Sequence, residues 1–99
     1  MDEAVTTGEA MRVRRVTIVN QRGLHARAAA KLAKLAASFE AEILVGRDDT
    51  TVTASSIMGL MMLAAGPGVE LDLKARGPAA EEALEALGAL IAQKFGEDV

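Results

Sequence analysis

Residues 69–75 alternate without a break between apolar and polar side chains, and this pattern constrains the fold more than any other in the sequence. Val69, Leu71, Leu73 and Ala75 share one face of the segment, and Glu70, Asp72 and Lys74 share the other. A strand with one apolar face and one charged face belongs to a sheet that is covered on one side and open to water on the other. We therefore expect a sheet layered against helices.

The remaining segments supply the partners of this strand. Strands are predicted over about residues 12–19, 41–45 and 50–53, with a hairpin turn over 46–49. Helices are predicted over about residues 26–38 and 57–63, and a last helix is expected to begin with Pro78 at its first position and to end at Lys94 and Gly96. The order β-α-β-β-α-β-α predicts an α+β fold, a two-layer open-faced β-sandwich whose four-stranded antiparallel sheet is covered on one face by three helices.

The length of 99 residues suits one domain, which we place at residues 12–99. Residues 1–11 are predicted to be a disordered acidic extension, because the segment is polar and has no apolar period. The absence of cysteine excludes a disulfide framework and a thiolate zinc site. No apolar run has the length of a membrane span, and the first ten residues carry three acids and no base, unlike a signal peptide. The expected location is the cytoplasm, without membrane insertion.

The net charge of −3 is unevenly distributed, and residues 11–35 form a basic block. Residues 1–10 contribute −3, residues 11–35 contribute +7 without a single acid, and residues 36–99 contribute −7 from four bases and eleven acids. Such a block favours acidic partners or phosphate, although a solvated helix face and a charged edge strand would produce the same count.

His25, the only histidine, lies at the centre of this block, after Gly23 and directly before the helix predicted from residue 26. A metal site would need a second histidine or a cysteine nearby, and a hydrolytic triad would need an orienting acid, which the sequence lacks between Glu9 and Glu40. Burial of His25 is not expected beside two arginines. The start of a helix is instead a favourable place for an anion, because its first N–H groups have no partner within the helix.

Two interpretations of His25 follow from the residues alone. In the first, the neutral imidazole is a nucleophile that accepts a phosphoryl group, and Arg27 and the helix N-terminus neutralise the phosphoryl charge. An imidazole with the ordinary pKa of about 6.5 is largely neutral near pH 7. In the second, His25 is only a helix cap.

The segment from Ser56 to Leu63 also has two interpretations. Ser56 is placed to cap the following helix, or to be a regulatory phosphorylation site whose phosphate adds about two negative charges to a docking surface. The side chains of Ile57, Met58, Met61 and Met62 belong either to the core or to a surface that binds several partners.

Other classes of function find no support. The sequence contains neither G-x-x-x-x-G-K-[ST] nor G-x-G-x-x-G, so no nucleotide cofactor is predicted. The strands lack the aromatic side chains with which a four-stranded sheet stacks RNA bases, so no nucleic acid partner is predicted.

Residues 23–27, Gly-Leu-His-Ala-Arg, and residues 56–61, Ser-Ile-Met-Gly-Leu-Met, together resemble the HPr family, the histidine-containing phosphocarriers of the bacterial phosphotransferase system, including its nitrogen-related NPr branch. The resemblance covers about residues 12–96. It implies that His25 carries the phosphoryl group on Nδ1 with the assistance of Arg27. It also implies that Enzyme I, charged by phosphoenolpyruvate, is the donor and that a IIA protein or domain is the acceptor.

The resemblance assigns further roles and shows one departure. Ser56 matches the serine that HPr kinase/phosphorylase modifies where that regulation exists. The apolar docking surface corresponds to Leu24, Ile57, Met58 and Met61. Ala28 stands where the family usually has proline, which leaves one more N–H free at the start of the helix.

The sequence therefore predicts a phosphocarrier, in sugar uptake or in nitrogen or carbon regulation, rather than an enzyme that turns over. The alternative is a regulatory binding module controlled by phosphorylation of Ser56. A third possibility is a ligand-binding domain that shares only the fold of the HPr family. No residue in the sequence indicates a binding pocket for a small molecule.

Overall fold

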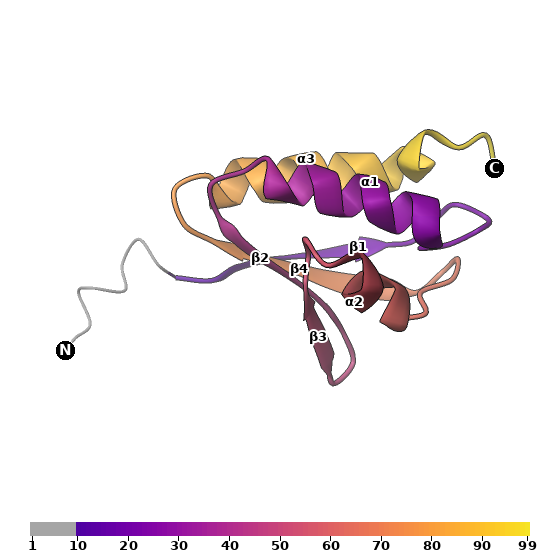
Figure 1. Ribbon diagram of the computed structural model, residues 1–99, viewed down its shortest axis with the longest axis horizontal. Coiled ribbons are helices and arrows are strands. Elements are labelled where there is room, and N and C mark those ends of the chain that lie inside the picture. The colour runs from indigo at the N-terminus through magenta and orange to yellow at the C-terminus, as the bar shows by residue number, and fades with distance from the viewer. Residues whose placement is uncertain (1–9) are drawn as a thin grey trace.

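The computed structural model describes residues 10–99 and has the predicted order of elements (Figure 1). These are β1 (Arg12–Thr17), α1 (Ala26–Ala37), β2 (Glu42–Arg47), β3 (Thr50–Thr53), α2 (Ile57–Met62), β4 (Glu70–Arg76), α3 (Ala80–Ala92) and a 3-10 turn, η2 (Lys94–Gly96). The acidic extension predicted for residues 1–11 falls mostly on residues 1–9, outside the described part of the chain. Within residues 10–99, no helix combines the length and the hydrophobicity that a membrane-spanning segment requires.

The four strands form one antiparallel sheet in the order β1-β4-β2-β3. The alternating strand is therefore central: Leu73 of β4 pairs with Arg14 of β1 on one side and with Val45 of β2 on the other. The apolar side chains of β4 face the helices and are buried, as the alternation predicts, and the charged ones lie on the open face. The predicted open-faced α+β sandwich is confirmed.

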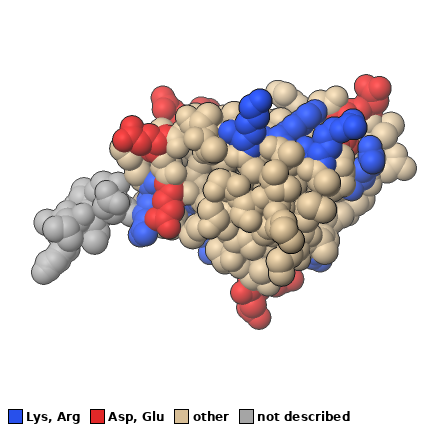
Figure 2. Space-filling model, in the orientation of Figure 1, with Lys and Arg blue, Asp and Glu red and all other residues tan. Residues whose placement is uncertain are grey.

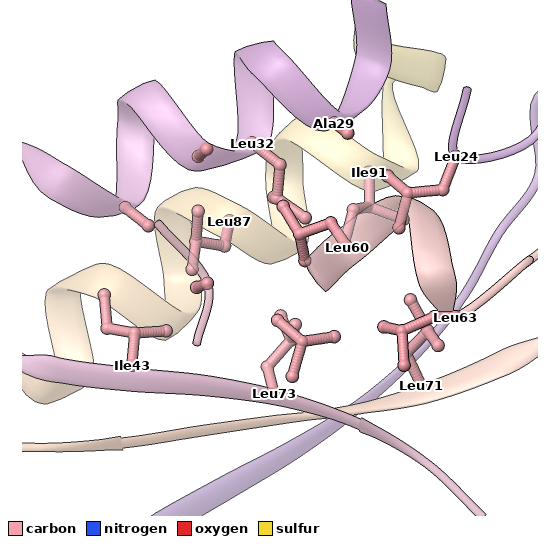
Figure 3. Close-up of a cluster of buried hydrophobic side chains, with 14 of the residues drawn as sticks. Leu24, Ala29, Leu32, Ile43, Leu60, Leu63, Leu71, Leu73, Leu87 and Ile91 are labelled. Atoms are coloured by element: carbon pink, nitrogen blue, oxygen red, sulfur yellow. The ribbon is translucent and has the colours of Figure 1, made fainter. Parts of the chain in front are cut away.

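The core lies between this sheet and the helices and is almost entirely aliphatic (Figure 3). In the close-up, Leu32 of α1 and Leu87 of α3 approach from the helical layer, and Leu73 and Ile43 lie on the strands below them. Leu60 of α2 reaches the same cluster and is fully buried. The only fully buried aromatic ring is that of Phe95, among the described residues.

Three predicted boundaries are wrong. Gly46 and Arg47 belong to β2, so the hairpin turn contains only Asp48 and Asp49, with Asp48 at φ 53°. Pro78 lies before the helix rather than at its first position, because the chain first makes a turn in which the Ala80 N–H donates to the Gly77 carbonyl at 3.2 Å. A proline with its fixed φ is well suited to such a turn.

The third difference is at the C-terminus of α3. The helix ends at Ala92, and Lys94 and Phe95 have φ values of 60° and 55°, so the chain turns sharply. The Phe95 ring is fully buried, and it reaches the core from η2 rather than from α3. This turn brings the C-terminal segment to the end of the molecule at which α1 begins (Figure 1).

Candidate phosphoryl-acceptor site

His25 is the N-cap residue of α1, with an extended backbone at φ −77° and ψ 179°. The loop before it is fixed by two features. Gly23 has φ 68°, and a Cβ atom there would lie 2.6 Å from the Ala65 carbonyl oxygen, so only glycine fits. The Leu24 N–H donates to the same carbonyl at 2.8 Å. The position of His25 therefore depends on the segment that follows α2.

The backbone at the start of α1 offers free donors. The first bond of the helix is donated by the Ala29 N–H to the His25 carbonyl at 2.8 Å, so the N–H groups of Ala26, Arg27 and Ala28 have no acceptor within the helix. The His25 side chain makes no capping bond to them. The hydrogen bond that a capping histidine would make is therefore absent at His25. The free N–H groups at the start of α1 could instead bind the oxygens of a phosphoryl group.

The imidazole is held from its other side by the C-terminal segment. Nε2 of His25 is hydrogen-bonded to Oε2 of Glu97, and Oε1 of Glu97 accepts from Nδ2 of Asn20 at 2.9 Å. The side chains of His25 and Glu97 are 19% and 15% exposed. The His25 side chain is therefore more buried than we expected from its position between Arg22 and Arg27 in the sequence, and it lines a depression on the surface.

These hydrogen bonds shift the ionisation of Glu97. Donation by Asn20, then by His25, lowers the pKa of the Glu97 carboxyl, and the nearby charge of Arg22 acts in the same direction. Partial burial opposes the shift but does not cancel it. Glu97 is a carboxylate at neutral pH.

Basic side chains surround this end of the molecule. Arg27, Lys31 and Lys34 are exposed along α1, and Figure 2 shows Lys and Arg side chains gathered over this helix. Arg22 lines a depression of about 220 Å³ next to His25, together with Leu24, Ala64, Ala65 and Gly66. The predicted basic block is thus divided: Arg22 and the bases of α1 lie on the side of the imidazole, whereas Arg12, Arg14 and Arg15 lie on β1, where Arg15 pairs with Glu70 and Asp72.

Ser56 is the N-cap of α2, and its Oγ accepts from the Gly59 N–H at 3.0 Å. The capping role of Ser56 is therefore observed. Three of the four predicted docking residues lie on the outside of α2: Ile57, Met58 and Met61 are 43%, 74% and 43% exposed. Met62 is 76% exposed, and we call these four the α2 apolar surface.

Leu24 differs from the other predicted docking residues. Its side chain is 5% exposed and belongs to the core cluster, where it lies between the start of α1 and α2 (Figure 3). The Leu24 side chain therefore anchors the loop before α1 in the core, and we leave Leu24 out of the docking surface.

Two residues of the site were not found from the sequence. Glu97 is separated from His25 by 72 positions and Asn20 from Glu97 by 77, so no local spacing connects them. The absence of an acid near His25 in sequence was consequently misleading, because the acid comes from the C-terminal segment. The described residues contain no cluster of three or more His, Cys, Asp or Glu side chains that could hold a metal ion.

Comparison with known proteins gives one consistent family. The profile of the PTS-HPr family, described as the PTS HPr component phosphorylation site, matches residues 13–93. The chain belongs to the HPr family of phosphocarrier proteins. It is 52% identical to Phosphocarrier protein HPr of Cupriavidus necator over 84 residues, which is 85% of this chain and 94% of that protein.

Relatives from the other branch of the HPr family and solved structures agree with this membership. Phosphocarrier protein NPr of Shewanella violacea is 48% identical over 85% of this chain and 92% of its own length. The crystal structure of HPr-C-His from Thermoanaerobacter tengcongensis superimposes with a TM-score of 0.85 at 42% identity, covering 89% of this chain and 99% of that one. The family profile ends at residue 93, so Glu97 lies beyond the matched segment.

Proposed function

We propose that this protein accepts a phosphoryl group on Nδ1 of His25 from Enzyme I, charged by phosphoenolpyruvate, and passes it to a IIA protein or domain. The observation that carries the proposal is the position of His25: its imidazole lies at the start of α1, beside N–H groups that have no acceptor within the helix. Family membership supports the same role.

Arg27 and the free N–H groups of α1 stabilise the phosphoryl oxygens electrostatically, and Arg22 adds charge at the adjoining depression. The reaction is reversible, and the protein is phosphorylated and regenerated in each cycle instead of acting as a turnover enzyme. It operates in the cytoplasm, in sugar uptake or in nitrogen or carbon regulation.

The α2 apolar surface is the docking surface for both partners. Flexible thioether side chains can adapt to more than one partner, and a large part of each methionine side chain on this surface is exposed to solvent. Replacing Met58 or Met61 with Asp should slow transfer from Enzyme I, whereas Val13→Asp, on the opposite edge of the sheet, should not. Equal rates for the three variants, each checked for folding, would remove this surface from the proposal.

The decisive experiment is incubation with phosphoenolpyruvate and Enzyme I. We expect a phosphate that is labile in acid and stable in base, located on His25 and absent from His25→Ala. An Arg27→Ala variant should retain slow phosphorylation, because it keeps the nucleophile and the backbone donors. If the wild-type protein carries no such phosphate, the proposal is wrong.

A regulatory role for Ser56 is the second candidate. Ser56 lies at the N-cap of α2, next to the α2 apolar surface, so a phosphate there would place charge beside the docking residues. HPr kinase/phosphorylase is the expected enzyme. If partner regulation in cells survives His25→Ala but is abolished by Ser56→Ala, the regulatory module is the main function.

A further inference from the structure

The C-terminal segment is tied to the loop and helix that carry His25 at three points besides His25 itself. The Gln21 N–H donates to the Val99 carbonyl at 2.8 Å, Nζ of Lys31 donates to the Phe95 carbonyl at 2.6 Å, and Nδ2 of Asn20 donates to Glu97 at 2.9 Å. The sharp turn at Lys94 and Phe95 is anchored by the fully buried Phe95 ring. Glu97 is therefore held in place rather than approaching His25 by chance.

The two carboxylate oxygens of Glu97 have separate partners. Oε1 accepts from the Asn20 amide, and Oε2 lies against Nε2 of His25. An ionised carboxylate has no hydrogen to donate, so Nε2 must carry the proton of the neutral ring. Among the described residues, no protein atom forms a hydrogen bond to Nδ1. In this tautomer Nδ1 therefore has the free lone pair.

We propose that Glu97 is a positioning residue for phosphoryl transfer, which keeps the ring proton of His25 on Nε2 and so presents Nδ1 as the nucleophile. The inference rests on the proposed role of His25 as phosphoryl acceptor. It adds a residue from the C-terminal segment, beyond the part of the chain that the family profile matches.

The step balances without loss of a proton from His25. The lone pair of Nδ1 forms a bond to the phosphorus of the phosphoryl group on charged Enzyme I, and the bond from that phosphorus to the donor atom of Enzyme I breaks with its electron pair remaining on the donor atom. The phosphorylated ring keeps its Nε2–H and gains positive charge, which the Glu97 carboxylate neutralises. In onward transfer the N–P bond breaks toward Nδ1 and a neutral imidazole leaves, whereas a ring without the Nε2 proton would have to leave as an imidazolate.

The test uses the full-length protein with Glu97→Ala and Glu97→Gln, and with Asp98→Asn as the control that removes one exposed charge from the neighbouring position. ¹⁵N NMR of the unphosphorylated protein should show the Nε2–H tautomer in the wild type and in Asp98→Asn. Glu97→Ala should show both tautomers and lose the slowly exchanging Nε2 proton. Phosphorylation of Glu97→Ala by charged Enzyme I should be at least about tenfold slower, the ratio expected for one lost charge-assisted hydrogen bond.

The outcomes separate this inference from the proposed function. If the wild type is phosphorylated on His25 while Glu97→Ala and Asp98→Asn have equal rates and equal ring resonances, the role of Glu97 is overturned and the carrier function stands. A slower rate without any change of tautomer also overturns it, because Glu97 would then affect the rate by some route other than fixing the ring proton on Nε2. Glu97→Gln preserves the length of the side chain, and its rate of phosphorylation should lie between those of the wild type and Glu97→Ala. This variant controls for the possibility that Glu97→Ala unfolds the C-terminal segment. Absence of phosphate on wild-type His25 would instead end the carrier function.

Discussion

Nδ2 of Asn20 donates to Oε1 of Glu97 at 2.9 Å and to the Gly23 carbonyl at 2.9 Å, and so joins the C-terminal segment to the loop that carries His25. The Asn20 side chain is completely buried, and its Oδ1 has no hydrogen-bond partner within residues 10–99. One amide group therefore connects two parts of the site that are 77 positions apart in sequence.

Asn20→Ala should destabilise the protein by about 1–3 kcal/mol, because it leaves the Gly23 carbonyl without its donor and opens a space in a buried position. Denaturation by urea measures the change in the free energy of unfolding. Gln21→Ala is the control, since the Gln21 side chain is exposed and only its backbone binds Val99. Equal stabilities of the two variants would contradict the structural role of Asn20.

The stability of the protein should depend on pH through Glu97. The pKa of this carboxyl is lower in the folded state than its ordinary value of 4.5, so Glu97 contributes stability above pH 4.5 and loses it as the pH falls through the lowered pKa. The wild type should be more stable than Glu97→Gln at about pH 5, and the difference in the free energy of unfolding should shrink as the pH falls below 4.5. Urea titrations at several pH values check this, and a difference that grows in acid would refute it.

Gly23→Ala should be among the most damaging substitutions of a small residue. The left-handed backbone alone costs an alanine about 1–2 kcal/mol, and the new Cβ would in addition collide with the Ala65 carbonyl at 2.6 Å. Gly68→Ala isolates the first term, because Gly68 has φ 89° but no atom within 4 Å of the added Cβ. We expect Gly23→Ala to be clearly less stable than Gly68→Ala and to shift the NMR resonances of His25, and similar stabilities would show that the loop can relax.

Ala64→Gly should stabilise the protein by up to about 1 kcal/mol. Ala64 follows the end of α2 with φ 51°, a conformation that glycine adopts without steric cost. Ala37→Gly, at the last residue of α1, is the matched control and should destabilise by a similar amount. Thermal unfolding distinguishes the two directions, and a loss of stability in Ala64→Gly would show that the strain at this position is negligible.

The layers of this protein and the chemical character of its site could be predicted from local sequence patterns. The unbroken alternation of residues 69–75 predicts a half-buried strand, which the structure confirms, because a period of two depends only on neighbouring residues. The same local signals placed His25 at the start of α1 and Ser56 at the N-cap of α2.

The groups that contact the imidazole could not be predicted in this way, because they come together only in the folded chain. Leu24 was expected on the surface and lies in the core, since the hydrogen bond of its N–H to Ala65 directs the loop inward. Glu97 reaches His25 because the chain turns at Lys94 and Phe95 and the Phe95 ring is buried. Such contacts are set by packing between segments about 70 residues apart, which no periodicity within one segment can encode.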